Sequence, residues 1–174
     1  TCNDDLIAMG RAFAASPLIV AGSGVAIGLP ANHGLEPSTA AASLPPPRGT
    51  RAIVSGSCSV ATNAQVKHFL NTGGAAFRID PLAIARGDDV VGAALGWGET
   101  RLSVSQPILF YATAEATSVA AVQAQLGVAQ AGEAVERVLS QVARGLVERG
   151  VRQLVVAGGE TSGACVQALG IERL

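Results

Sequence analysis

Residues 152–163 have the sequence RQLVVAGGETSG, in which an apolar segment runs directly into a turn of glycines and hydroxyl side chains. Residues 152–157 form the most regular apolar run of the chain, which predicts a buried strand. The turn at 158–163 then leads into a helix that we expect to continue to Leu169. A buried strand, a glycine turn and a helix in this order are typical of a parallel sheet covered by helices.

The same alternation extends along the chain. Other short apolar runs predict strands at 18–21, 51–54, 76–79 and 107–111. Helical spacing of apolar residues predicts helices at 3–15, 25–32, 60–70, 119–125 and 133–149, with a glycine-interrupted helical stretch at 82–98. We therefore predict an α/β fold, a mostly parallel sheet covered by helices in a Rossmann-like three-layer arrangement. Residues 34–49, which hold four prolines among Ser, Thr and Ala, predict an internal Pro-rich linker.

The composition argues against two classes of protein, disordered chains and nucleic-acid-binding domains. The chain has 174 residues, 49% of them hydrophobic and 14% charged, which excludes intrinsic disorder of the whole chain. It carries a net charge of −1, a pI of about 6.1 and six aromatic residues. A nucleic-acid-binding domain would be expected to be basic and to offer stacking platforms, so we expect no nucleic-acid partner.

Cysteine usage and hydropathy predict the compartment. Cys2, Cys58 and Cys165 are widely spaced, and with two histidines in the chain they offer no zinc-ligand pattern. No apolar window is long enough to span a membrane and no signal-peptide pattern opens the chain. These features predict a cytoplasmic protein with reduced cysteines, no resident metal and no membrane partner. The sequence begins without Met and stops in what resembles the start of another strand, so we expect a fragment.

Three glycine- and serine-rich segments, at 22–24, 55–59 and 158–163, each follow a predicted strand. Such turns let a ligand approach the backbone and present N–H groups at the positive end of a helix, which suits phosphate. Gly22, Ser23 and Gly24 begin a G-x-G-x-x-x-G pattern, which departs from the dinucleotide fingerprint and lacks its later acidic residue. A phosphate contact and a simple tight turn both remain open for this segment.

The other two segments also leave alternatives open. One serine of 55–59 can cap the following helix, which does not account for three hydroxyls. A Cys58 nucleophile would need an imidazole, and His68 lies two to three turns along the helix, so we do not favour it. Glu160 either favours the start of a capped helix or completes a phosphate cradle through bound Mg²⁺ or water. The segment is no Walker A loop, because the single lysine is Lys67.

Several motifs together resemble the four-carbon acid sugar kinase family, which includes 3-oxo-tetronate, threonate and erythronate kinases. They occur in order across nearly the whole chain. They are residues 22–24 with GLPAN at 28–32, AIVSGSCS at 52–59, TNAQV at 62–66, FRIDP at 77–81 and VVAGGETSG at 155–163.

The resemblance implies an ATP-dependent sugar-acid kinase with Mg²⁺, which phosphorylates the terminal hydroxyl of a four-carbon sugar acid. In this family an N-terminal domain with an Asp-Asp motif binds the acid and a C-terminal domain binds the nucleotide. Residues 1–174 resemble most of the nucleotide-binding domain, so the isolated chain should be inactive, and its paired aspartates at 4–5 and 88–89 stand in other contexts. The implied ATP contacts are Ser55, Ser57, Gly158, Gly159, Glu160 and Thr161, together with Gly22, Ser23 and Gly24. No catalytic residue is assigned.

Two other functions compete with the kinase: a non-catalytic nucleotide- or anion-binding module, and an NAD-binding dehydrogenase domain that uses residues 22–28. We predict that Ser57 and residues 158–161 line one cleft with their N–H groups converging on an anion. Valine at Gly158 or Gly159 should then abolish nucleotide binding and leave the fold largely intact. We also predict a homodimer, in which the linker at 34–49 passes residues 1–33 to a neighbouring copy by domain swapping.

Overall fold

The computed structural model describes residues 2–43, 48–103, 105–112 and 128–172. The chain divides into two compact units, Thr1–Pro46 and Pro47–Leu174, and each is described here by itself. The division falls inside the Pro-rich stretch 34–49. The predicted helix at 119–125 lies outside the described residues.

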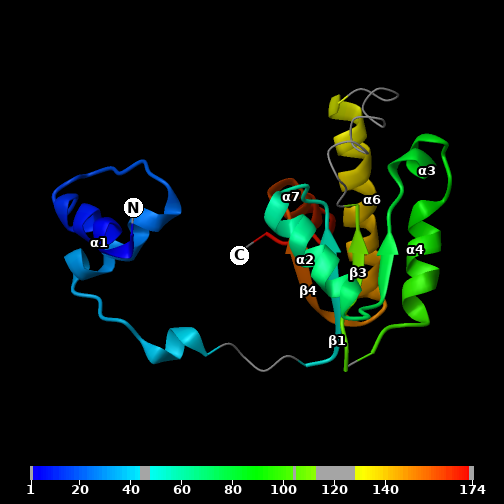
Figure 1. Cartoon of the computed structure of the whole chain (residues 1–174), viewed down its shortest axis with the longest axis horizontal. Coiled ribbons are helices and arrows are strands. Elements are labelled where there is room, and N and C mark those ends of the chain that lie inside the picture. The colour runs from blue at the N-terminus through cyan, green and yellow to red at the C-terminus, as the bar shows by residue number, and fades with distance from the viewer. Residues whose placement is uncertain (1, 44–47, 104, 113–127, 173–174) are drawn as a thin grey trace. The chain divides into compact units, whose positions relative to one another are not determined.

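The larger unit is built on a parallel sheet of four strands, β1 (Thr50–Ser55), β2 (Ala76–Arg78), β3 (Ile108–Tyr111) and β4 (Val151–Ala157). Their order across the described sheet is β2-β3-β1-β4, and all neighbouring pairs are parallel (Figure 1). β1 therefore lies between β3 and β4, and its register aligns Ser55 with Ala157. The predicted α/β fold is confirmed, and the strands match the predicted ones to within one residue at each end.

Helices connect the strands and flank the sheet, with α2 in front of it and α6 behind it in Figure 1. Their bounds are α2 Val60–Asn71, α3 Pro81–Ala85, α4 Val90–Glu99, α6 Val128–Glu148 and α7 Gly159–Ala168.

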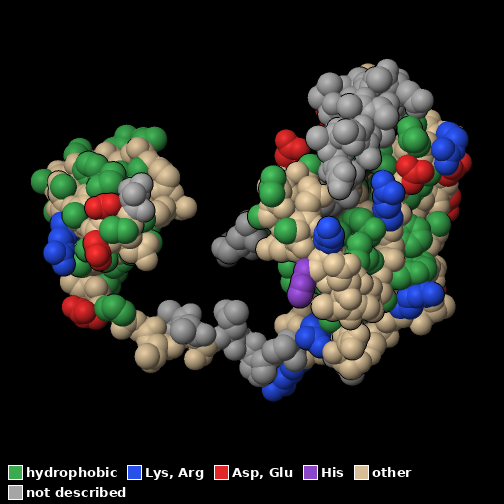
Figure 2. All heavy atoms as spheres, in the orientation of Figure 1, with side chains coloured by type: hydrophobic (Ala, Val, Ile, Leu, Met, Phe, Trp, Pro, Cys, Tyr) green, Lys and Arg blue, Asp and Glu red, His purple; other side chains and the backbone are tan. Residues whose placement is uncertain are grey.

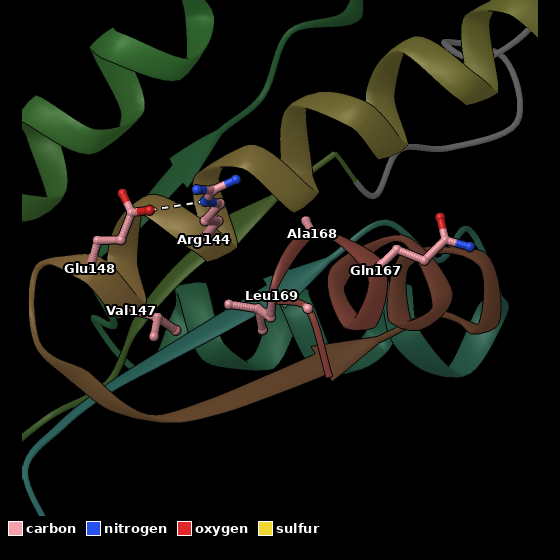
Figure 3. A pocket seen from close by; sticks show the side chains of 7 residues that line it. Arg144, Val147, Glu148, Gln167, Ala168 and Leu169 are labelled. Carbon is pink, nitrogen blue, oxygen red and sulfur yellow. Dashed lines mark hydrogen bonds and ion pairs between the residues drawn. The ribbon is translucent and has the colours of Figure 1, made fainter. Parts of the chain in front are cut away.

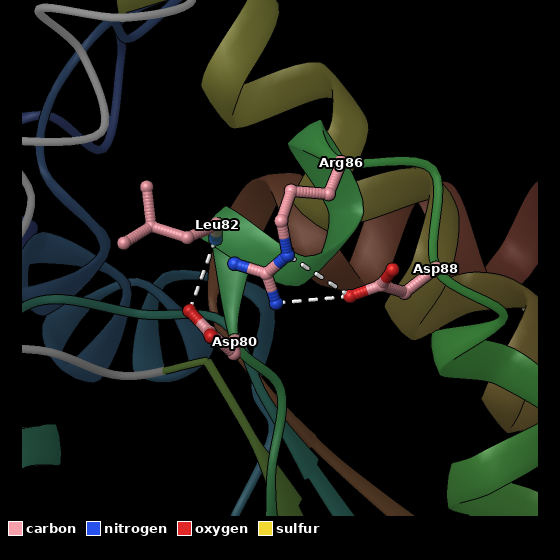
Figure 4. A network of polar contacts seen from close by, with 4 residues as sticks. All are labelled: Asp80, Leu82, Arg86 and Asp88. Atoms are coloured by element: carbon pink, nitrogen blue, oxygen red, sulfur yellow. Dashed lines mark hydrogen bonds and ion pairs between the residues drawn. The ribbon is translucent and has the colours of Figure 1, made fainter.

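The stretch expected to be helical at 82–98 is split into α3 and α4 around Gly87, whose φ of 81° ends the first helix. Asp80 begins α3 by accepting the Leu82 N–H at 3.0 Å, and Arg86 pairs with Asp88 at 2.9 Å just after its end (Figure 4). The polar side chains around α3 thus form their hydrogen bonds and ion pair within this segment.

The core lies between the sheet and α6. The predicted apolar face of α6 is confirmed, because Leu139, Val142 and Leu146 are fully buried. They belong to one cluster with Val54 of β1 and Phe110 of β3. Burial of these apolar side chains holds α6 against the sheet. It thereby also positions the polar side chains that α6 carries.

The smaller unit pairs a helix with short 3₁₀ turns. α1 (Asn3–Ala12) packs against η1 (Ser23–Gly28), with η2 (Pro30–His33) and η3 (Thr39–Ala42) following. The packing is a direct backbone contact: a Cβ placed on Gly10 would lie 2.4 Å from the carbonyl carbon of Gly28. Where a continuous helix was predicted at 25–32, two 3₁₀ segments meet at Leu29.

The predicted strand at 18–21 is wrong. These residues form no strand, and the side chains of Leu18 and Val20 are 79% and 92% exposed. A four-residue apolar run is buried only when a sheet receives it, and no described strand of this unit offers one.

Two surface observations complete the fold. Within the described residues, no helix has both the length and the hydropathy that crossing a membrane would require. On the face drawn in Figure 2, the Lys and Arg side chains of the larger unit stand apart from one another rather than forming one patch. The absence of a nucleic-acid partner stays a prediction.

Candidate functional site at the carboxyl ends of β1 and β4

Two of the predicted loops meet at the carboxyl edge of the sheet, because β1 and β4 are direct neighbours and end in register. The carbonyl of Ala157, the last residue of β4, accepts the N–H groups of Gly56 at 3.1 Å and Ser57 at 3.3 Å. A Cβ placed on Gly158 would lie 3.2 Å from the Ser57 nitrogen. The predicted adjacency of Ser57 and residues 158–161 is confirmed, whereas a shared cleft that binds an anion stays a prediction. The expectation that the Ser57 N–H points to that anion is wrong, because this group donates to Ala157.

The β1 loop is ordered by a network of hydroxyl groups. Ser59 caps α2 by accepting the Thr62 N–H at 3.1 Å, and its hydroxyl donates to the Thr62 hydroxyl at 2.9 Å. The Thr62 hydroxyl donates in turn to Ser57 at 3.2 Å, which also accepts the Ser59 N–H at 3.3 Å. The Ser57 hydroxyl thus accepts two hydrogen bonds and donates to no other described residue, so its proton is available to a ligand.

The β4 loop places two glycines, Gly158 and Gly159, next to the β1 loop. Gly158 has a φ of 126° and caps α7 without a side-chain hydrogen bond. The first bond of α7 runs from the Ser162 N–H to the Gly158 carbonyl at 2.9 Å, so the N–H groups of residues 159–161 are left unpaired by the helix itself. Gly159 is exposed, and a Cβ on it would meet nothing within 4 Å. These N–H groups form the positive end of a helix of ten residues.

Beneath the two loops lies a layer of buried polar side chains. Thr161 is 1% exposed, and its hydroxyl donates to Oε1 of Glu136 on α6 at 3.0 Å. Ser55 is likewise 1% exposed. The other carboxylate oxygen of Glu136, Oε2, is buried and has no hydrogen-bond partner among the described residues. The loops therefore lie on a carboxyl group that the described residues satisfy only in part.

Burial perturbs two titratable groups in this layer. It raises the pKa of the Glu136 carboxyl above its usual 4.5; the Thr161 hydrogen bond lowers that pKa in part, and the charge of Glu160 raises it further. Burial also raises the pKa of the Cys165 thiol from 9.0 to about 11, and the nearby Glu136 charge adds to that rise. Both shifts disfavour negative charge directly under the loops.

The remaining predicted site residues divide by location. Gly22, Ser23 and Gly24 belong to the smaller unit, where Gly22 precedes η1 and no strand comes before it. Their role in binding a ligand stays a prediction. The Ser57 N–H is engaged by Ala157, so Ser57 offers its hydroxyl rather than its backbone to a ligand. The Thr161 side chain is likewise engaged, which leaves its backbone N–H.

Other features lie away from these loops. A pocket of about 490 Å³ is lined by the C-terminal ends of α6 and α7, with Arg144, Glu148, Gln167 and Leu169 among its residues (Figure 3). Both helices run antiparallel to β4, so this pocket lies toward the amino edge of the sheet. The parts of the chain that the structure describes hold no cluster of three or more metal-ligating side chains.

Two residues of the site were not predicted to belong to it. Thr62 follows the capping Ser59 by three residues, a spacing that could have identified it as part of the loop. Glu136 stands 25 residues before its partner Thr161, in the middle of an amphipathic helix. No local pattern distinguishes it from a solvated helix residue.

Comparison with known proteins shows the family. Residues 52–174 match the family model described as a nucleotide-binding C-terminal domain. The chain is 51% identical to a 3-oxo-tetronate kinase of Cupriavidus necator over 98% of its own length and 40% of that protein. The resemblance to the four-carbon acid sugar kinase family is confirmed.

Solved structures show the same fold. A Haemophilus influenzae protein of the DUF1537 family aligns with a TM-score of 0.75 and 30% identity, over 97% of this chain and 40% of that one. A DUF1537 protein of Bordetella bronchiseptica, described as a domain-swapped dimer with bound citrate, aligns with a TM-score of 0.52 and 18% identity, over 99% of this chain and 40% of that one. The chain thus spans about two fifths of the length of these relatives. It belongs to the family of nucleotide-binding C-terminal domains.

Proposed function

We propose that the chain is the nucleotide-binding part of an ATP-dependent kinase that phosphorylates the terminal hydroxyl of a four-carbon sugar acid, of the 3-oxo-tetronate, threonate or erythronate type. One observation carries the proposal: the β1 and β4 loops adjoin at the carboxyl edge of the sheet. There, the N–H groups of residues 159–161, which α7 leaves unpaired, and the Ser57 hydroxyl belong to loops that contact each other. Ligands of open α/β sheets bind at such an edge.

Phosphate is the ligand that this chemistry suits. Backbone N–H groups at a helix start donate to phosphate oxygens without a lysine, and the open space at Gly159 lets the ligand approach the backbone closely. Phosphoryl transfer depends mainly on positioning and on charge stabilisation. The larger unit would supply the positioning of ATP, and the acid would be bound by a part of the protein outside this chain.

Mg²⁺ would accompany ATP at this site. The only carboxylate exposed at the start of α7 among the described residues is Glu160, and Mg²⁺ typically keeps most of its water and binds one or two carboxylates together with the phosphates. One carboxylate with no further protein ligand fits an ion that arrives with the nucleotide. We assign Glu160 to the metal's water shell.

The experiment is calorimetric titration of the 174-residue chain with ATP·Mg, ADP, NAD, threonate and inorganic phosphate. We expect saturable binding of ATP·Mg and ADP, no binding of threonate at sub-millimolar concentration and no phosphotransfer by the chain alone. Binding of NAD without ATP would overturn the kinase proposal. That outcome is disfavoured by the smaller unit, where the glycines at 22–28 lack the strand that a dinucleotide fingerprint requires. Binding of inorganic phosphate as tightly as ATP would support the anion-binding module.

Assembly and compartment remain part of the proposal. The relative from Bordetella bronchiseptica is described as a domain-swapped dimer. We propose a homodimer for this chain as well, formed through residues 1–33 and the linker at 34–49, and a cytoplasmic enzyme of carbohydrate metabolism. Light scattering at micromolar concentration should give twice the chain mass of 17.4 kDa. A mass of one chain would contradict the dimer.

A further inference from the structure

The Thr161 hydroxyl is the point at which three segments distant in sequence meet. It donates to Glu136 on α6 at 3.0 Å. A Cβ on Gly56 of the β1 loop would lie 2.3 Å from the Thr161 oxygen and 2.9 Å from Oε1 of Glu136. A Cβ on Gly158 of the β4 loop would lie 2.8 Å from the same hydroxyl. Both loops therefore contact the Thr161 hydroxyl, and both have a glycine at the point of contact. A side chain at Gly56 or Gly158 would displace the hydroxyl from its hydrogen bond with Glu136.

This hydrogen bond joins the first turn of α7 to α6. Thr161 is the third residue of α7 and is 1% exposed, so its side chain cannot reach a ligand. Its N–H belongs to the three unpaired donors of that turn. Glu136 is held in turn by the buried face of α6, where Leu139 and Val142 are fully buried. The buried helix α6 is thus connected, through Glu136 and Thr161, to the N–H groups of residues 159–161.

We infer that Glu136 is a positioning residue of the nucleotide site: through the Thr161 hydroxyl it aims the N–H groups of residues 159–161 at the phosphates, and its protonation state is coupled to nucleotide binding. The inference rests on the proposed function, since it takes a nucleotide as the ligand of these loops.

The coupling follows from the charges around Glu136. The titratable groups that face it are Glu160 and Cys165 of α7, and no described Lys or Arg side chain pairs with it. An ionised Glu136 beneath an anion site repels the phosphates, while a protonated one does not. Nucleotide affinity should therefore be higher below the raised pKa of Glu136 and fall as the pH rises through it.

Two substitutions separate the hydrogen bond from the charge. T161V removes the hydroxyl at nearly constant volume, and T161S restores it. E136Q keeps an oxygen that can accept from Thr161 and removes the charge. E133Q is the matched control, because Glu133 is exposed one turn earlier on α6.

The experiment measures ADP affinity of the 174-residue chain by calorimetry from pH 5 to 8, and hydrogen exchange of the α7 start without ligand. We expect T161V to weaken ADP binding about tenfold and to speed exchange of the Ser162 N–H by a similar factor, with T161S and E133Q within about twofold of wild type. E136Q should bind ADP at least about threefold more tightly than wild type at pH 8, with the difference shrinking as the pH falls through the raised pKa of Glu136. Comparing variants at equal pH removes the titration of ADP itself.

The inference is overturned if T161V and T161S exchange and bind alike, or if E136Q follows wild type at every pH. Failure of the wild-type chain to bind any nucleotide would instead refute the proposed function. The exchange comparison between T161V and T161S needs no ligand, so it would still decide the positioning role.

Discussion

Gly158 and Gly159 are adjacent in the sequence, yet the structure predicts opposite effects of alanine at the two positions. At Gly158 the φ of 126° costs an L residue about 1–3 kcal/mol. The added Cβ would also lie 2.8 Å from the Thr161 hydroxyl, and relieving such an overlap typically costs about 1–3 kcal/mol. G158A should therefore lower the free energy of unfolding by about 2–6 kcal/mol.

G159A introduces none of this strain. Its Cβ meets nothing within 4 Å, and alanine is favoured over glycine in a helix by up to about 1 kcal/mol. The stability of G159A should thus equal or slightly exceed that of wild type. If phosphates approach the backbone here, the new methyl group occupies their place, and nucleotide affinity should fall at least about tenfold, or about 1.4 kcal/mol.

Urea unfolding followed by circular dichroism measures the first effect, and calorimetry with ADP measures the second. G163A is the control, because Gly163 lies one turn further along α7 and also has open space at its Cβ. It should match wild type in affinity. Equal stability of G158A and G159A would refute the strain argument, and wild-type affinity of G159A would refute the phosphate approach. The earlier expectation that the fold tolerates valine at Gly158 is corrected by the same geometry.

Three further predictions concern the core and its titratable groups. Leu139→Ala, at a fully buried position of α6, should cost about 2–5 kcal/mol in urea unfolding; a loss below about 1 kcal/mol would place that face of α6 outside the core. Burial and a pKa of about 11 should make Cys165 react far more slowly with a thiol reagent at pH 8 than the exposed Cys2 and Cys58, and equal rates in the folded protein would contradict its position. Because folding raises the pKa of Glu136, the folded state binds more protons than the unfolded one between 4.5 and the raised pKa, so this group lowers stability as the pH rises through that window. E136Q should gain stability over wild type across the window and keep a constant advantage above it, and a pH-independent difference would exclude the shift.

The larger unit was predictable because its signals are local. Each strand of the sheet is an apolar run next to a glycine or serine turn, and α6 shows its buried face through Val138, Leu139, Val142 and Leu146. Parallel topology then required the loops after β1 and β4 to share one edge, although about one hundred residues separate them.

What the sequence could not reveal depends on tertiary partners. Leu18 and Val20 have the composition of a strand, but a strand exists only where a neighbour pairs with it, and the smaller unit provides none among the described residues. Glu136 resembles any polar residue of an amphipathic helix. Its burial arises from the approach of Thr161, which no sequence window containing Glu136 includes.

The proposed function requires that a nucleotide binds where the β1 and β4 loops meet. Titration of the ¹⁵N-labelled chain with MgADP, followed by amide chemical shifts, tests it most directly. We expect saturable shifts concentrated at residues 55–59 and 158–162, with the amides of residues 159–161 moving most. Shifts confined to the pocket at the ends of α6 and α7, or none at saturating nucleotide, would contradict it.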